Sequence, residues 1–445
     1  MNKKQILFLH GLLLLVFVLS FCTPPKSSRP GTTSGQGRTR PTDKTRHEPM
    51  DTVRWGTPGT TKPPIGPSGN AGGNTGSTGL PGQTYRIAYL LPFLGSQYDG
   101  TAVPEKSRYA LQFYTGAKLA LQKISEQGGI NLVVDIYDTN ASDADFQKLL
   151  NDSRLRKASV FIGPVRSSHV SALATWAKTN RKIVLSPESP NSDLTSQNPD
   201  FIQINPSLQA HCAAIARYAL KNHSNPAVTL VCKQKEAERL AYFHAANTQT
   251  ARFTEWVLPD ETTSFSNQNF SSYLKAGRTN VFILPSWSSQ DFINAFLRQL
   301  KAVKGNARVE VYGMPQWANF ESIEPEFFRD LNVHISAASY ISYHTAEVKA
   351  FQQAFYENTG TIPDEDAFAG YDLTLYTGSL LRQYGLSFPQ RLSEEDYAGL
   401  HGRYWFTKIF AGGKPDDGTN KMDYWENSFV HILKYGADGF APPSD

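Results

Sequence analysis

From Tyr85 onward, short apolar runs alternate regularly with amphipathic segments, and this alternation limits the choice of fold more than any other feature. Residues 86–91, 131–137 and 160–162 have the length and composition of buried strands, and segments of helical periodicity separate them. Strands that alternate with helices predict an α/β fold in which helices cover both faces of a parallel sheet. The alternation starts again after residue 207, so we expect two similar lobes in tandem.

The order of these segments assigns distant parts of the chain to the same lobe. We expect lobe 1 to consist of 85–206 and 340–392, and lobe 2 of 207–339 and 393–445. Near the end of the chain, 404–409 and 427–435 have the pattern of two strands that pair with each other in antiparallel orientation. Ligands of open parallel sheets bind at the carboxyl ends of the strands, so two facing lobes would form a central cleft that a hinge can close.

The first residues have the features of an export signal. Lys3 and Lys4 precede an apolar run over 6–19, which is too short to span a bilayer comfortably but suits a signal core. The run ends in Leu19-Ser20-Phe21-Cys22, which resembles a bacterial lipobox. We therefore expect a signal peptide over 1–22, a lipid on Cys22, and anchoring to a membrane of the cell envelope, at the periplasmic face of the outer membrane. An ordinary signal peptide or an uncleaved anchor is the alternative.

Residues 23–84 consist mainly of Pro, Gly, Thr, Ser and Asn, a composition that cannot bury enough apolar surface to fold. We predict a disordered tether that is dispensable for folding, so a chain starting near Thr84 should unfold at the same midpoint. Within the tether, Asp51-Thr52-Val53 resembles the sites at which Bacteroidetes glycosylate exported proteins. Eight basic and three acidic side chains lie in this segment, whereas the rest of the mature chain is slightly acidic. We do not expect nucleic acid as a partner, because such binders normally concentrate basic charge on the folded domain.

The segment from Phe161, with sequence FIGPVRSSHVSALATWAKTNRKIVLSPESP, resembles the type I periplasmic-binding family, the group of leucine/isoleucine/valine-binding proteins. The stretch 363–372 is similar to the segment before the late helix of that family, and the resemblance covers about 85–385. It implies two Rossmann-like lobes with parallel sheets and a central cleft. Phe113-Tyr114-Thr115-Gly116-Ala117 and Gln203-Ile204-Asn205-Pro206-Ser207 are also similar to Bacteroidetes envelope lipoproteins with this fold.

Two serines are candidate ligands for an anion in the first lobe. Ser167 and Ser168 stand where the third strand turns into a helix, and their hydroxyls and the free amides there could bind a carboxylate. Capping of the helix alone is the other interpretation. The resemblance also implies a role in ligand binding for Ser186, Glu188 and Ser189, in the turn after the next strand.

On the second lobe, the resemblance implies binding positions at Glu236, Trp287 and Gln316. Gln316 occupies the place where relatives use an acidic residue on the ligand's amine. Because Gln316 is neutral and Glu188 is charged, we expect a ligand with a positive or hydrogen-bond-donating group near Glu188. Trp287 is expected to close over the apolar part of that ligand. The cleft could also hold a different ligand, or none.

Motifs for catalysis and for cofactors are missing from the sequence. There is no phosphate-binding Gly-rich loop, no nucleophile elbow and no zinc-protease motif, so we do not expect an enzyme, a metal site or a cofactor. His211 lies beside Cys212 without a third ligand at a suitable spacing. Cys212 and Cys232 either pair in an oxidising compartment or serve as small buried hydrophobes.

Two functions fit these features. The first is a lipid-anchored solute-binding protein that captures a small ligand, such as an amino acid, a peptide or a wall fragment, for transport or sensing. The second is an interaction module without a ligand that regulates an envelope partner such as a peptidoglycan synthase. The expected partners are therefore the small-molecule ligand, the membrane and a possible membrane protein.

Overall fold

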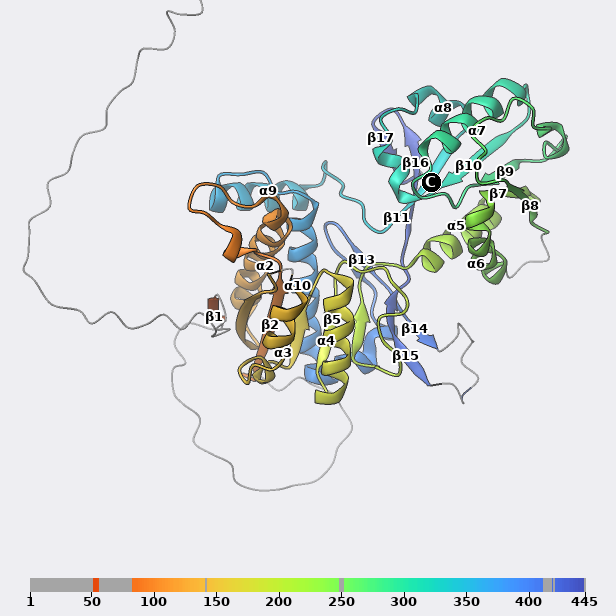
Figure 1. Cartoon of the computed structure of the whole chain (residues 1–445). Helices are drawn as coiled ribbons and strands as arrows, with labels where there is room; N and C mark the ends of the chain where they lie inside the picture. Colours follow the sequence, from red (N-terminus) through yellow and green to blue (C-terminus); the bar gives the residue numbers. More distant parts are fainter. Residues whose placement is uncertain are drawn as a thin grey trace, which may run out of the picture. The chain divides into compact units, whose positions relative to one another are not determined.

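The computed structural model of the chain describes residues 51–55, 82–140, 142–247, 252–410, 418 and 421–443 (Figure 1). These residues belong to one compact unit, His47–Asp445. The signal peptide and Cys22 lie outside them. None of the helices in these ranges has both the length and the apolar character needed to cross a membrane.

Lobe 1 is built on a twisted sheet whose centre is parallel. The central order is β3 (Asn131–Asp138), β2 (Thr84–Leu91), β4 (Val160–Ile162), β5 (Ile183–Ser186) and β6 (Phe201–Gln203), with all neighbouring pairs parallel. This confirms the parallel sheet that the alternating pattern predicts.

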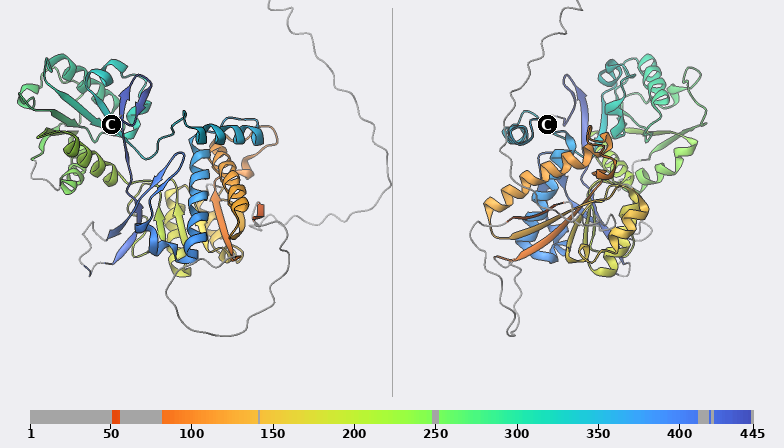
Figure 2. Two further views of the ribbon diagram at one scale, coloured as in Figure 1. Left: turned by 180° about the vertical axis from the view of Figure 1, so that it is seen from behind. Right: turned by 60° about the vertical axis from the view of Figure 1, so that its left-hand side comes forward.

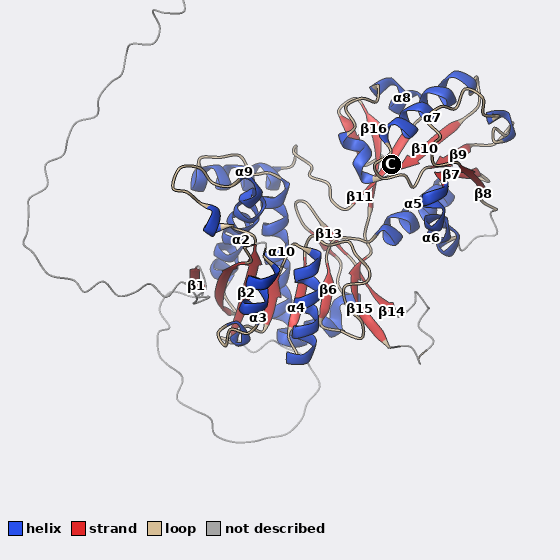
Figure 3. Cartoon of the chain, in the orientation of Figure 1, coloured by secondary structure: helices blue, strands red, loops and turns tan. Residues whose placement is uncertain are grey.

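Helices cover both faces of this sheet (Figures 2 and 3). Alternate residues of β2 point to opposite sides: Ile87 and Tyr89 join the core under α2 (Arg108–Gln127) and α10 (Glu365–Tyr384). Ala88 and Leu90 join the core under α3 (Asp143–Leu150) and α4 (Ser167–Asn180). The alternation of side chains along a strand thus produces two apolar layers, which is why these strands read as continuous apolar runs.

The helices α2 and α10 pack with their backbones in close contact. A Cβ atom at Gly116 would lie 1.8 Å from the carbonyl oxygen of Ala367, and one at Gly370 would lie 2.0 Å from that of Phe113. Only glycine fits at both crossings. The contact fixes the first turn of α10, which lies beside the candidate site. A further helix, α9 (Ala346–Thr359), packs against α2 and α10 through Phe351 and Phe355.

Lobe 2 repeats the arrangement around a second sheet. Its order is β17-β16-β11-β10-β9-β7-β8, and the five strands from β11 to β8 are parallel. The strands are β7 (Ala227–Lys233), β8 (Thr254–Leu258), β9 (Asn280–Ile283), β10 (Val309–Gly313), β11 (Val333–Ala337), β16 (His431–Gly436) and β17 (Gly439–Ala441). The helices are α5 (Leu208–Asn222), α6 (Leu240–Ala246), α7 (Gln290–Val303) and α8 (Pro325–Asp330).

Short elements complete the described chain. The short strands β12 (Tyr397–Ala398) and β13 (Arg403–Tyr404) pair with each other. The 3-10 helices are η1 (Gly95–Gln97), η2 (Glu105–Ser107), η3 (Leu155–Lys157), η4 (Gln234–Arg239), η5 (Phe270–Ser272), η6 (Pro315–Asn319) and η7 (Gly385–Glu394).

The prediction for the C-terminal segment is partly wrong. β14 (Phe406–Phe410) pairs antiparallel with β15 (Met422–Asn427), and β15 continues the sheet of lobe 1 alongside β6. Only β16 and β17 belong to lobe 2, where β16 pairs with β11. The apolar pattern identifies strands, but it does not show which of two open sheet edges each strand joins. The chain therefore passes between the lobes three times, at 204–207, 338–345 and 428–430.

The expected tether contains one strand that the composition did not predict. β1 (Asp51–Trp55) pairs antiparallel with β3, from Asp51 opposite Ile136 to Trp55 opposite Leu132. The prediction that 23–84 has no regular structure therefore fails over these five residues. Thr, Val and Trp favour strands, but the surrounding Pro and Gly residues outweighed this short signal.

Candidate functional site

A small cavity lies at the carboxyl ends of the lobe 1 strands. It has a volume of about 180 Å³, and segments from lobe 1 and from the connections between the lobes line it. The lining residues are Phe113, Pro187, Glu188, Ile204, Asn205, Pro206, Ala338, Ser339, Glu365, Asp366, Ala369, Leu373, His401, Gly402, Tyr404 and Asn427. Glu188 follows the end of β5, and Glu365 and Asp366 form the first turn of α10.

Carboxylates dominate the charge of this cavity. Burial raises the pKa of Glu188, and the neighbouring hydroxyl of Tyr109 opposes this rise. Burial raises the pKa of Asp366 to about 7, and the charges of Asp364, Glu188 and Glu365 add to the effect. The guanidinium of Arg108 opposes it, but Arg108 is mostly exposed and is paired with Asp364 at 3.0 Å. The structure thus encloses negative charge without a buried cation among the cavity's lining residues.

The side-chain amides of Asn205 and Asn427 at the cavity wall donate hydrogen bonds to backbone oxygens. Nδ2 of Asn205 donates to the backbone oxygen of Glu188 at 2.8 Å. Nδ2 of Asn427 donates to the backbone oxygens of Ile204 and Arg403 at 3.2 and 3.1 Å. Both amides thus donate within the protein, and the hydroxyls of Ser339 and Tyr404 complete the polar wall.

His401 adds a neutral imidazole to the wall. Burial lowers the pKa of His401 to about 4. The backbone amide of His401 donates to Asp372 and its backbone oxygen accepts from Tyr340, whereas its ring has no hydrogen-bond partner within the described ranges. Asp372 of α10 accepts bonds from the backbone amides of Leu400, His401 and Gly402 at 2.9, 2.7 and 3.0 Å, and so fixes this loop.

The two serines at the start of α4 are occupied by protein groups. Oγ of Ser168 donates to Oδ1 of Asp143 at 3.0 Å, and Oγ of Ser167 lies 3.3 Å from Oγ of Ser189. Arg166 and His169 also contact Asp143, at 3.4 and 3.0 Å. The hydrogen bond from Ser168, followed by the charges of Arg166 and His169, lowers the pKa of Asp143. An internal carboxylate therefore stands where the sequence predicts a ligand's anion.

Lobe 2 contributes to a second hollow of about 730 Å³. Trp287 lines it and meets His211 edge to face, with ring centroids 5.8 Å apart. Burial lowers the pKa of His211 to about 4, so this imidazole is also neutral at pH 7. This hollow and the smaller cavity share Asn205, Pro206, Ala338, Ser339 and Glu365, and so adjoin each other.

The comparisons with known proteins agree with this geometry. The family model described as periplasmic binding protein matches residues 100–407. The chain belongs to this family.

Solved structures show the same fold at low sequence identity. An ABC-type branched-chain amino acid transporter from Rhodopseudomonas palustris is 14% identical, with a TM-score of 0.54. The match covers 81% of this chain and 95% of the Rhodopseudomonas chain. A branched-chain amino acid ABC transporter periplasmic ligand-binding protein from Burkholderia xenovorans is 13% identical with a TM-score of 0.51, covering 81% and 94%. An ABC transporter substrate-binding protein from Desulfitobacterium hafniense is 17% identical with a TM-score of 0.50, covering 80% and 99%. No curated protein matches the chain.

The remaining residues that the sequence predicts as ligands of this periplasmic binding protein are Glu236, Gln316 and Ser186. In η4, Oε1 of Glu236 accepts from Arg239 at 2.9 Å and Oε2 accepts from Ser286 at 2.5 Å, so its charge is neutralised inside lobe 2. Gln316 is exposed on η6 and lines neither hollow. Ser186 is fully buried at the end of β5, and its hydroxyl has no partner among the described residues.

Asp143, Asp366 and His401 are not among the residues that the sequence predicts for the site. Asp366 lies inside the 363–372 segment that carries the family resemblance, so its proximity to Glu188 could have been suspected. His401 lies on a short loop without a motif, and only the contacts of Asp372 bring it to the cavity. In the described part of the chain, no group of three His, Cys, Asp or Glu side chains is placed to hold a metal ion. Cys212 and Cys232 are buried free thiols.

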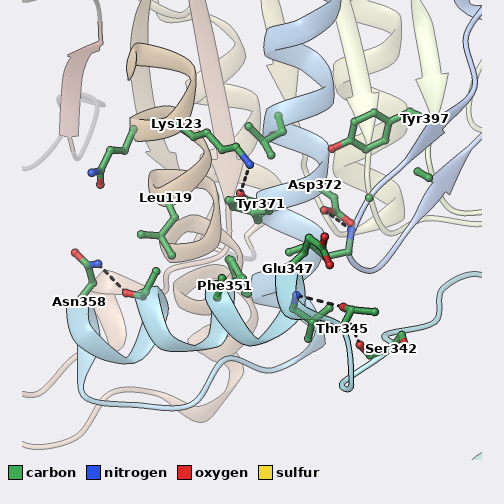
Figure 4. A pocket seen from close by; sticks show the side chains of 18 of the residues that line it. Leu119, Lys123, Ser342, Thr345, Glu347, Phe351, Asn358, Tyr371, Asp372 and Tyr397 are labelled. Carbon is green, nitrogen blue, oxygen red and sulfur yellow. Dashed lines mark hydrogen bonds between the residues drawn. The ribbon is translucent and has the colours of Figure 1, made fainter. Parts of the chain in front are cut away.

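A larger groove of about 900 Å³ lies apart from the small cavity, between α2, α9, α10 and the 397–400 loop (Figure 4). Lys123 donates to the hydroxyl of Tyr371 across it at 3.3 Å, and Asp372 lies at its wall. None of its lining residues belongs to the small cavity. The groove is therefore separate from the strand ends at which this periplasmic binding protein has its candidate site.

Proposed function

We propose that this protein is a lipid-anchored solute-binding protein of the cell envelope, which captures a small ligand for transport or sensing. The observation that carries the proposal is the cavity of about 180 Å³ at the carboxyl ends of the lobe 1 strands. Parallel sheets bind ligands at this edge. The named functions of the structural relatives, substrate binding for ABC transporters, support transport as the use of the captured solute.

A thermal-shift screen tests ligand capture directly. The mature chain is heated with amino acids, short peptides, muropeptides and small amines, each at a concentration well above the expected Kd. A ligand at a hundredfold excess over its Kd stabilises the folded state by about 2.7 kcal/mol, which raises the unfolding midpoint measurably. If none of these classes raises the midpoint, the capture proposal fails and a ligand-free module is the better description.

Anchoring rests on the lipobox and on the expected tether over 23–84. Acylation of Cys22 would hold the protein on the periplasmic face of the outer membrane and leave the two lobes free to meet a membrane-protein partner. The Cys22→Ala variant should move from the membrane fraction to the soluble fraction of the native host. Retention of this variant in the membrane would instead indicate an uncleaved apolar anchor.

A further inference from the structure

The first turn of α4, which does not line the cavity, is the place where the sequence predicts a ligand's anion. The carboxylate of Asp143 accepts the hydroxyl of Ser168 at 3.0 Å and lies 3.4 Å from Arg166. The side chains at the start of α4 are therefore already satisfied by a negative charge from the protein. A ligand carboxylate placed there would meet Asp143 at close range and would be repelled.

The cavity itself offers acceptors. Glu188, Glu365 and Asp366 line it, and their carboxylates can only accept hydrogen bonds when ionised. Among its donors, Asn427 donates to two backbone oxygens and Asn205 to one, while the hydroxyls of Ser339 and Tyr404 can both donate and accept. Because three carboxylates and no Lys or Arg of the described chain line this space, it favours a group that donates hydrogen bonds and carries positive charge.

His401 adds a hydrogen-bond acceptor to the wall. Its partly exposed imidazole lines the cavity and makes no hydrogen bond among the described residues. Since burial keeps this ring neutral, one of its nitrogens is a free acceptor. An N–H group of a ligand would satisfy it.

The volume limits the size of the group that can enter. An engineered protein cavity of about 150 Å³ holds a benzene molecule, so about 180 Å³ suits one charged head and a short stem. Phe113 and Leu373 supply apolar wall for that stem. The rest of a longer ligand can continue into the adjoining hollow beside Trp287.

We propose that the cavity of lobe 1 takes the cationic end of an organic amine or guanidine, held by Glu188, Asp366 and His401, and that this end carries no carboxylate. This inference rests on the proposed capture function and names its ligand class. It departs from the zwitterionic amino acids named for several structural relatives.

Calorimetric titration of the mature chain with three probes tests the inference. We expect 1,5-diaminopentane to bind, glutarate, its dicarboxylate counterpart in length, to show no binding, and leucine to bind at least about tenfold more weakly than the diamine. Glu188→Gln should weaken diamine binding about tenfold or more, as the loss of a charge-assisted hydrogen bond does. Glu126→Gln is the matched control, because Glu126 is an exposed lobe 1 carboxylate outside the cavity.

The outcomes separate the two proposals. If leucine or glutarate binds as tightly as the diamine, or if Glu188→Gln leaves diamine affinity unchanged, the cation inference is overturned. Failure of the diamine to bind also overturns it. The capture function survives these results if any other ligand of the thermal-shift screen raises the unfolding midpoint. Thermal unfolding of each variant without probe shows that it is folded before its affinity is compared.

Discussion

Oγ of Ser168 lies 3.0 Å from Oδ1 of Asp143, and this hydrogen bond joins the first turns of α4 and α3. One of the two serines that the sequence predicts as ligands of an anion is thereby used inside the lobe. The polar groups at the start of α4 bind an anion, but this anion is the carboxylate of Asp143. The ligand must then be recognised by the other groups at the strand ends.

The first prediction concerns this pair. Ser168→Ala removes one exposed hydrogen bond to a carboxylate, so the free energy of unfolding should fall only slightly. The affinity for a captured ligand should change less than about twofold, because the hydroxyl already serves Asp143. Urea unfolding and calorimetric titration measure the two effects. A large loss of affinity in this variant would instead show that Ser168 takes part in ligand binding.

The second prediction is a pH dependence of cation binding. The charged groups facing Asp366 are Asp364, Glu188, Glu365 and Arg108. With a pKa of about 7, Asp366 is largely protonated at pH 6 and ionised at pH 8. A cation favours the ionised form, so the affinity for 1,5-diaminopentane should rise from pH 6 to pH 8 and then level off. His401, with a pKa of about 4, does not titrate in this range.

Asp366→Asn provides the comparison for that pH profile. The amide cannot ionise, so the affinity should become nearly independent of pH between 6 and 8. The folded state also binds a proton at Asp366 more tightly than the unfolded state does, since its pKa is raised above 3.8. In the wild type this contribution to stability is present at low pH and is lost as pH rises towards 7. An unchanged slope of affinity in the variant would assign the titration to another group.

The layered fold could be predicted because it depends on local pattern. The strands of lobe 1 are apolar on both faces, and β2 sends alternate residues into two separate cores. The pairing of β15 with β6 could not be predicted, since the pattern of a strand does not show which sheet edge it joins. The strand β1 could not be predicted either, because five residues are too few to form a clear strand pattern in a Pro- and Gly-rich segment.

The candidate site was predictable only in part. Glu188 was identified from the turn after β5, and the structure places it in the cavity. The pairing of Glu236 with Arg239 follows the i,i+3 spacing and was visible in the sequence, whereas its bond with Ser286 depends on the fold. The contact of Asp143 with Ser168 joins two helices, and no periodicity within either helix reveals it.

The third prediction concerns the loop that carries His401. Asp372 is fully buried and accepts three backbone amides of 400–402, so Asp372→Ala would leave these donors without their partner. The free energy of unfolding should fall by about 3 kcal/mol or more. Gly399→Ala is a second way to disturb the same contact, because a Cβ there would lie 2.3 Å from Cγ of Asp372.

Measurements of ligand affinity distinguish a role of Asp372 in positioning His401 from a role in stability alone. If Asp372 positions His401 for the ligand, both variants should lose affinity for the diamine at temperatures where they remain folded. His401→Ala should show the same loss with a smaller change in the unfolding midpoint. Full affinity in the folded Asp372→Ala variant would show that this loop has no part in the site.

The last prediction concerns the boundary of the folded domain. β1 pairs with β3 over five residue pairs, so a chain that begins at residue 82 leaves β3 as the exposed edge of the lobe 1 sheet. Cross-strand pairs contribute about 0.2–1 kcal/mol each, and the entropy lost in joining β1 to the sheet offsets part of this. A chain beginning at residue 48 should therefore be more stable than the shorter chain by about 1–2 kcal/mol.

Val53→Pro in the longer chain should bring its unfolding midpoint towards that of the shorter chain, because proline disrupts a paired strand. Sedimentation should also show more self-association of the shorter chain, since an open edge strand can pair with another copy. Equal midpoints for all three proteins would restore the original expectation that the folded domain begins near Thr84.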